Sequence, residues 1–250
     1  MSNADPIMKL YFVTGTTKGL GRALAEQLAR DANNEVVTFA RRADGIVGAR
    51  HYDLDLALPE RIAAVFAAAL KDCKATAYDT ATLYNNAGVV GPVGPLSSCD
   101  PGAVDVNIRV NLTSPIILTG AFVAGTAALS KRRLVVNISS GAGKRPVAGW
   151  GAYCASKAGL DMATRVAGLE AYDPGLIVCS LAPGVVDTPM QAQVRGASEA
   201  DFPDVARFRA MKEEGTLRPP EDVAAAILAI EAAGRFVNGG LLDIREMEAR

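Results

Sequence analysis

Short apolar runs alternate with helical patterns along almost the whole chain. Each run is apolar on both faces and rich in β-branched or aromatic residues, which is typical of strands buried in a parallel sheet. The segments between them show apolar residues at helical spacing, or are alanine-rich. Strands are predicted at 9–14, 35–40, 49–54, 81–84, 134–139, 176–181 and 239–244, and helical segments at 22–31, 59–70, 107–129, 150–160 and 223–233.

This alternation predicts an α/β fold: a Rossmann-type doubly wound domain with a parallel sheet of about seven strands and helices on both faces. We see no linker, composition shift or repeat that divides the chain. We therefore expect one domain over residues 8–250, preceded by a flexible tail over 1–7. Residues 188–218 interrupt the alternation, and we expect them to form mobile helical pieces that act as a substrate lid.

Composition narrows the class of protein. Half of the 250 residues are apolar and the formal net charge is -1, with 26 basic residues against 27 acidic ones. No basic run is longer than Lys131–Arg133, so we expect no nucleic-acid partner. We expect no signal peptide, because the first residues lack an apolar core, and no apolar run approaches the roughly 20 residues of a membrane span. We expect a cytoplasmic protein without a membrane partner.

The four cysteines are scattered, so we expect neither a metal site nor a disulfide framework.

The first strand runs into a glycine-bearing turn that opens a helix. Gly15, Gly19 and Gly21 give the pattern TGxxxGxG, which lets the backbone approach a pyrophosphate at a helix N-terminus. At the end of the second strand, where an acidic residue would select NAD, Ala40 is followed by Arg41 and Arg42. An arginine can pair with a 2′-phosphate, and Lys18 can reach the same group, so NADP(H) is favoured.

Tyr153 and Lys157 stand four residues apart in the stretch WGAYCASKAGL. On a helix they share one face, and a cation beside a phenol lowers its pKa toward the range useful for proton transfer. The spacing alone is common on solvated helix faces.

Together these motifs resemble the short-chain dehydrogenase/reductase family over essentially the whole chain. The glycine motif, Asp53 with Leu54, the NNAG motif at 85–88, and PGxxxT at 183–188 match in order. The family's active-site tetrad is matched by Asn111, Ser140, Tyr153 and Lys157. The resemblance implies cofactor contacts from Gly15, Thr17, Lys18, Gly19, Leu20, Gly21, Arg41, Arg42, Asp53, Leu54, Asn86, Ala87, Gly88, Tyr153, Lys157, Pro183, Gly184, Val186 and Thr188.

Within the family the chain is most similar to the benzil reductase and sepiapterin reductase branch, on the stretches GWGAYCASKAGLDM and PGVVDTPMQAQVR. Trp150 and Met190 are candidate substrate contacts. Asp243 lies where sepiapterin reductases carry an acid that holds the pterin, although local hydrogen bonding at a strand end explains it equally well. The family resemblance also implies a homodimer or homotetramer built on the helices that carry Asn111 and Tyr153.

The implied reaction is NADPH-dependent reduction of a ketone or diketone. Tyr153 gives the proton, Ser140 donates to the carbonyl oxygen, and Lys157 lowers the Tyr153 pKa and bonds the nicotinamide ribose. Asn111 holds a water that links Lys157 to solvent. Two alternatives remain open: an alcohol dehydrogenase that works oxidatively on another secondary alcohol, and a non-catalytic NADPH-binding sensor.

Overall fold

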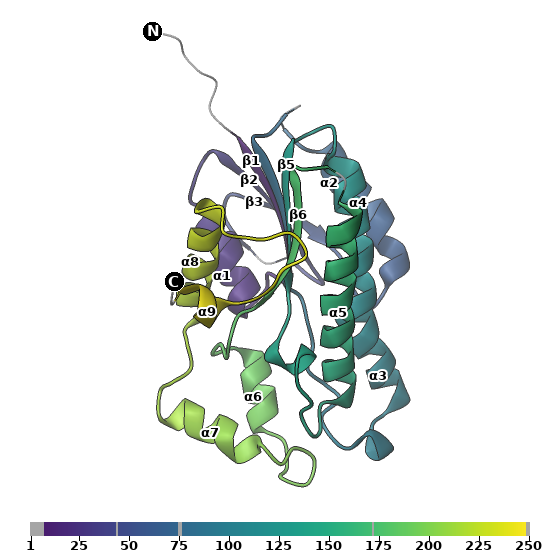
Figure 1. The fold of residues 1–250 in the computed structure, drawn as a ribbon, viewed down its shortest axis with the longest axis vertical. Helices are drawn as coiled ribbons and strands as arrows, with labels where there is room; N and C mark the ends of the chain where they lie inside the picture. The colour runs from purple at the N-terminus through teal and green to yellow at the C-terminus, as the bar shows by residue number, and fades with distance from the viewer. Residues whose placement is uncertain (1–7, 44, 75–76, 172, 249–250) are drawn as a thin grey trace.

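The strands form one parallel sheet in the order β3-β2-β1-β4-β5-β6-β7 (Figure 1). The computed structural model describes residues 8–43, 45–74, 77–171 and 173–248, so the predicted tail lies outside the described residues. The strands are β1 (Lys9–Thr14), β2 (Asn34–Ala40), β3 (Ala49–Asp53), β4 (Thr80–Asn85), β5 (Arg132–Ile138), β6 (Leu176–Ala182) and β7 (Leu241–Asp243). The predicted strands and fold class are confirmed, although β7 is shorter than expected.

The strand order reverses between β1 and β4. On one side of β1 the chain places β2 and then β3. It then crosses to the other side of β1 and places β4, β5, β6 and β7 there in order. In open α/β sheets the crevice at such a switch point, outside the carboxyl ends of the strands, is where ligands bind. The topology therefore places the loops after β1 and β4 at the centre of the site.

Helices cover both faces of the sheet (Figure 1). Leu24 of α1 and Ile227 of α8 belong to the apolar core on one face, whereas Phe66 of α2 and Phe122 of α4 pack against Phe12 of β1 on the other. Helix α9 lies beside α8, and α5 lies beside α4. The bounds are α1 (Gly19–Leu28), α2 (Ile62–Lys71), α3 (Pro101–Ile108), α4 (Ser114–Thr126), α5 (Gly151–Glu170), α8 (Pro220–Ala232) and α9 (Ile244–Glu248).

The helix predicted through Asn111 changes its hydrogen-bond pattern there. A π-helical segment, η3 (Arg109–Thr113), joins α3 to α4. Pro115 has no N–H to donate to a carbonyl in the preceding turn, and a π-turn is a usual way to absorb such a gap. Single π-turns are frequent at functional sites, and this one carries Asn111.

By length and composition the continuous helical stretch Pro101–Thr126 is apolar enough to cross a membrane, so the expectation that no segment qualifies is wrong. Inside this stretch Asn107 and Asn111 are fully buried and hydrogen-bonded, and α4 packs on α2 and β4. A helix in the core of a protein can have the same length and apolar composition. The contacts of α4 place this helical stretch against the sheet. Val106 and Ile116 remain exposed on its outer side.

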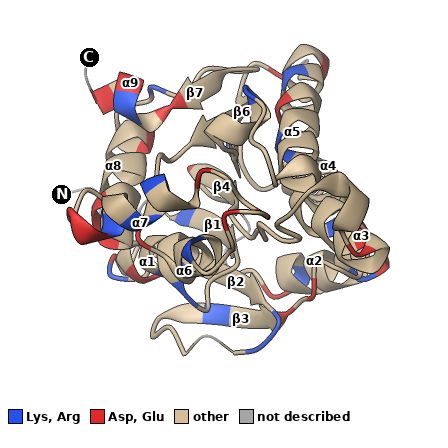
Figure 2. Ribbon diagram, turned by 90° about the horizontal axis from the view of Figure 1, so that it is seen from below, with Lys and Arg blue, Asp and Glu red and all other residues tan. Residues whose placement is uncertain are grey.

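The segment 188–218 forms two helices, α6 (Pro189–Arg195) and α7 (Val205–Glu213), beyond the carboxyl ends of the strands (Figure 1). Its two ends are held together because Asp187 donates its backbone N–H to Arg218, and Val186 and Arg218 form a β-bridge. Seen from this end in Figure 2, basic and acidic residues are interspersed around the rim.

Candidate active site

The glycine turn after β1 is packed against the NNAG segment after β4. Gly15 has a φ of 73°, and a Cβ there would come within 2.8 Å of the Ala87 Cα atom. The Thr14 hydroxyl accepts the backbone N–H groups of Asn86 and Ala87, each at 3.0 Å. The Asn86 side chain donates back to the Thr14 carbonyl. These bonds lock the two loops of the switch point into one unit.

Helix α1 begins at Gly19, directly after the glycine turn. Lys18 is its N-cap residue, makes no side-chain cap hydrogen bond, and no acidic residue lies in the first turn. The first N–H groups and the positive end of the helix dipole are therefore available to an anion. Gly19 also has positive φ, and a Cβ there would lie 3.1 Å from the Thr188 side chain. These residues fit the pyrophosphate of a dinucleotide cofactor.

The residues predicted to choose the cofactor lie at the edge of this turn. Arg41 and Arg42 are exposed directly after β2, and Lys18 is exposed on the glycine turn. Asp53 pairs in register with Ala40, its side chain is 75% exposed, and it accepts a hydrogen bond from His51. Among the described residues at the end of β2, Phe39 and Ala40 offer no carboxylate to a ribose.

Three of the predicted site residues meet around Gly88. A Cβ at Gly88 would lie 3.1 Å from Asn111 Oδ1, 3.9 Å from Lys157 Nζ and 3.9 Å from the Met190 methyl group. Because only hydrogen occupies this position, β4, η3, α5 and α6 can converge on one point. The structure therefore brings Asn111, Lys157 and Met190 to the same glycine from three different elements.

Tyr153 and Lys157 lie one turn apart on α5, as the spacing predicts, and both side chains are buried. Lys157 Nζ lies 5.8 Å from the centroid of the Tyr153 ring and donates a 2.7 Å hydrogen bond to the Ile138 carbonyl. Burial lowers the pKa of Lys157 to about 8, and the negative charge of Asp161 opposes that change. The lysine is thus poised to change charge close to physiological pH.

The prediction that Lys157 lowers the pKa of Tyr153 below its ordinary value is wrong in this structure. Burial raises the pKa of Tyr153 above its ordinary value, and a side-chain hydrogen bond with Ser140 offsets only part of that rise. Desolvation disfavours the phenolate, and the nearby ammonium is turned toward the Ile138 carbonyl. Tyr153 is therefore a protonated phenol at neutral pH.

Asn111 is fully engaged in hydrogen bonds to the protein. Its Nδ2 donates to the Val89 carbonyl at 2.7 Å and to Asn107 Oδ1 at 3.0 Å, and its Oδ1 accepts the Val89 N–H. Asn107, which the motif search did not single out, is fully buried and donates to the Gly91 carbonyl at 2.6 Å. The side chain of Asn111 therefore holds the loop after β4. The only sequence signal for Asn107 was its position one turn before Asn111.

The lid segment packs on the active-site helix through aromatic rings. Phe202 is fully buried and stacks on Trp150, with ring centroids 4.9 Å apart and an interplanar angle of 8°. The Trp150 ring also meets Tyr153 edge-on at 5.5 Å, and Phe208 completes the group. Trp150 thus lies beside Tyr153, the predicted catalytic tyrosine, and one face of its ring is covered by Phe202 of the segment 188–218.

Asp243 has a local partner. Its carboxylate accepts the backbone N–H of Arg245 at 3.1 Å and two guanidinium hydrogen bonds at 2.9 and 2.6 Å. These bonds hold the pKa of Asp243 below its usual range. The contact between Asp243 and substrate stays a prediction. The alternative, local hydrogen bonding at the strand end, is sufficient to explain how the carboxylate is held.

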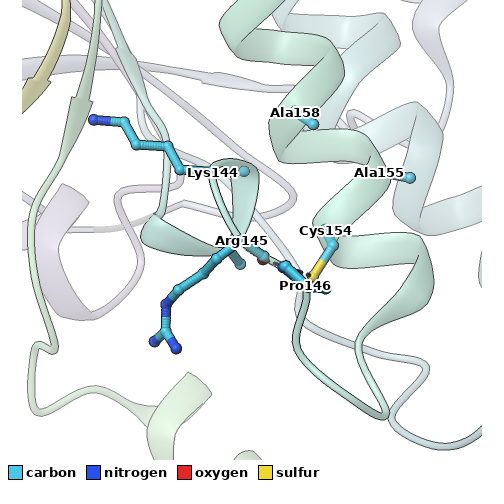
Figure 3. A pocket seen from close by; sticks show the side chains of 8 residues that line it. Lys144, Arg145, Pro146, Cys154, Ala155 and Ala158 are labelled. Carbon is cyan, nitrogen blue, oxygen red and sulfur yellow. Dashed lines mark hydrogen bonds between the residues drawn. The ribbon is translucent and has the colours of Figure 1, made fainter.

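A hollow of about 320 Å³ lies between α5 and the loop after β5 (Figure 3). Cys154 faces it, and the side chains of Lys144 and Arg145 extend away from the thiol. Among the described residues no cluster of metal ligands is found, and Cys73, Cys99, Cys154 and Cys179 are free.

Comparison with known proteins agrees with this geometry. The family model for short chain dehydrogenases matches residues 9–199. The chain belongs to the short-chain dehydrogenase/reductase family. It is therefore an oxidoreductase of a family that uses NAD(P)(H).

The chain is 39% identical over 243 residues to the benzil reductase ((S)-benzoin forming) of Bacillus subtilis, covering 96% of this chain and 99% of that one. It is 34% identical to the sepiapterin reductase of Meriones unguiculatus, covering 92% and 94% of the two chains. The crystal structure of the KRED1-Pglu enzyme superimposes with a TM-score of 0.80 at 31% identity, covering 94% of this chain and all of that one. The predicted family and branch are confirmed.

Proposed function

We propose that this protein is an NADPH-dependent carbonyl reductase that acts on ketones or 1,2-diketones of the benzil or sepiapterin type. The observation that carries the proposal is a buried, protonated Tyr153 beside Ser140 and Lys157, at the mouth of a dinucleotide cradle. Similarity to a benzil reductase over nearly the whole chain supports the substrate class.

The chain's own residues orient the carbonyl and supply the proton. The Ser140 hydroxyl donates a hydrogen bond to the carbonyl oxygen, and Tyr153 Oη gives that oxygen its proton as negative charge develops. NADPH, when bound, supplies the hydride that reduces the carbonyl carbon. The positive charge of Lys157 stabilises the phenolate that Tyr153 becomes. The product is a secondary alcohol.

A reductase needs Tyr153 as a protonated phenol, and burial keeps it in that form at neutral pH. The oxidative alternative uses the same residues, and the substrate panel below decides between the two directions. The sensor alternative offers no physical reason for placing Ser140, Tyr153 and Lys157 together.

The proposal is tested by NADPH consumption with a panel of carbonyl compounds. We expect turnover with benzil and related aromatic diketones, slower turnover with pterin-type ketones, and little with polyols assayed in the reverse direction. The buried Trp150–Phe202 pair and Met190 form an apolar surface that suits aromatic substrates. Preference for small hydrophilic polyols would contradict this substrate class.

Arg41 is expected to set the preference for NADPH. Arg41→Ala removes a cation that can pair with the 2′-phosphate, so we expect the Kd for NADPH to rise about tenfold, a cost of about 1.4 kcal/mol, and the Kd for NADH to stay unchanged. Both constants can be measured by fluorescence titration. Arg30→Ala, at another exposed arginine, is the matched control. Equal weakening of both cofactors would contradict the assignment.

Phe202 is expected to control substrate affinity. Phe202→Ala leaves a hole against Trp150, and truncation of a buried Phe costs about 3 kcal/mol or more. We expect KM for benzil to rise about tenfold, a loss of about 1.4 kcal/mol of binding, with a smaller change in kcat. Phe236→Ala, in the core beside α8, should lower the melting temperature and leave KM unchanged. A KM change in both variants would show a general loss of structure.

We also propose a cytoplasmic homodimer or homotetramer that pairs through the outer sides of α3, α4 and α5. Val106, Ile116, Met162 and Val166 are exposed there, and large apolar patches are typical of interfaces. Size-exclusion chromatography with light scattering measures the oligomeric state directly.

A further inference from the structure

Asp161 is a buried carboxylate one turn after Lys157 on α5. Its side chain is almost fully excluded from solvent, and residues four apart on a helix are neighbours on one face. Its Oδ1 atom has no hydrogen-bond partner among the described residues. A buried carboxylate without such a partner is costly, and it needs a nearby positive charge to persist in ionised form.

The turn that carries Ser140 closes over this carboxylate. A Cβ on Gly143 would come within 2.8 Å of Asp161 Oδ2 and within 3.0 Å of the Lys157 carbonyl oxygen. Only glycine allows the turn η4 (Gly141–Gly143) to lie so close to α5. Asp161 is therefore enclosed between the backbone of the serine turn and the turn of helix that bears the lysine.

Among the described residues, Asp161 is the one charged group that acts on Lys157. The elements packed against α5 are η4, β6, η3, α3 and α4. Their charged residues are Asp105 and Arg109, which pair with each other at the surface at 2.8 Å, and Cys179 of β6 is buried in the core on the opposite face. Directly after η4, Lys144 and Arg145 line the hollow beside α5, and the Lys144 ammonium donates to the Leu241 carbonyl. On α5 itself Arg165 and Glu170 are exposed, and Tyr153 is a neutral phenol.

We propose that Asp161 is a positioning residue that keeps Lys157 protonated and thereby sets the upper pH limit of the reductase. This inference rests on the proposed function for its consequence in catalysis. The charge relationship between the two side chains stands independently of the substrate. Asp161 touches neither substrate nor cofactor in this role, because it acts through Lys157.

Asp161→Asn keeps the shape of the side chain and removes its charge. An opposite charge favours the protonated lysine, so its loss lowers the pKa of Lys157 further below about 8. We expect the alkaline limb of the kcat/KM profile to move about one unit toward acid. Activity then falls about fivefold near pH 8 and about tenfold above pH 9, and it hardly changes near pH 6.

The test combines that profile with a titration that does not depend on activity. Protein labelled with [ε-¹³C]lysine is titrated by NMR, and the Lys157 signal is assigned with Lys157→Met. We expect the Lys157 midpoint to fall in Asp161→Asn and to stay in place in Asp161→Glu, which retains the charge. Asp105→Asn, at an exposed aspartate of α3, is the matched control and should change neither measurement.

Two results would overturn the inference: an unchanged Lys157 midpoint in Asp161→Asn, or a loss of activity by the same factor at every pH. If Asp161→Asn does not fold, Asp161→Ser removes the charge with a smaller polar side chain, and the NMR midpoint decides. Absence of carbonyl reduction by the wild-type protein would refute the proposed function, and the NMR midpoint would still test Asp161.

Discussion

Tyr153→Phe is expected to lower kcat for diketone reduction by about 10³-fold, within the range attributed to a general acid. Phenylalanine keeps the ring that packs edge-on against Trp150, so the pocket and the lid keep their contacts. The variant lacks the hydroxyl proton that burial holds on the wild-type phenol. Steady-state kinetics with benzil measures kcat, and fluorescence titration is expected to show an unchanged Kd for NADPH.

A matched tyrosine variant separates chemistry from structure. Tyr52→Phe removes a hydroxyl that donates to Asp72 at the far edge of the sheet, at 2.7 Å, and is expected to leave kcat unchanged. If Tyr153→Phe retained wild-type kcat, another group would have to supply the proton. If both wild type and Tyr153→Phe turned over equally slowly, the sensor alternative would be favoured.

Lys157→Met is expected to lower kcat/KM by about 10²- to 10³-fold, because a preorganised charge beside the developing phenolate is lost. Methionine has a comparable length and fills the buried space. The same substitution should also change how stability depends on pH. Kinetics at neutral pH measures the first effect, and urea unfolding at several pH values measures the second.

The direction of the pH effect follows from the difference between the pKa of Lys157 in the folded protein and its pKa in the unfolded chain. Its pKa is about 8 in the folded protein and 10.5 in the unfolded chain, so between these values the unfolded chain binds more proton. The contribution of Lys157 to the free energy of unfolding therefore rises with pH, by about 3 kcal/mol at most, from neutral pH to above 10.5. The difference between wild type and Lys157→Met should show this rise. A flat difference would contradict a buried ammonium with a lowered pKa.

The sheet and most of the site could be predicted because both depend on local sequence. Apolar runs such as 9–14 and 176–181 contain enough information to specify buried strands. Gly15 and Gly19 have positive φ, and Gly88 stands where a Cβ would come within 3.1 Å of Asn111 Oδ1. Such constraints involve a few neighbouring positions, so they can be recognised in the sequence.

The remaining features depend on contacts between distant segments. Spacing alone placed an ammonium beside a phenol, but the raised pKa of Tyr153 results from burial by Trp150 and the lid. The stacking of Phe202 on Trp150 joins residues fifty positions apart and has no local signature. The position of Asp161 could not be predicted for the same reason, because its burial depends on the glycine turn at 141–143. Electrostatics and lid packing therefore required the structure.

The central claim is that this chain transfers a hydride from NADPH to a carbonyl carbon while Tyr153 protonates the oxygen. The most direct measurement uses NADPH deuterated at the transferred position, with benzil as substrate and mass spectrometry of the product. The account predicts benzoin with one deuterium on the carbinol carbon from the wild-type protein, and almost none formed by Tyr153→Phe. Binding of the labelled cofactor without any deuterated alcohol from the wild-type protein, or product without the label, would contradict it.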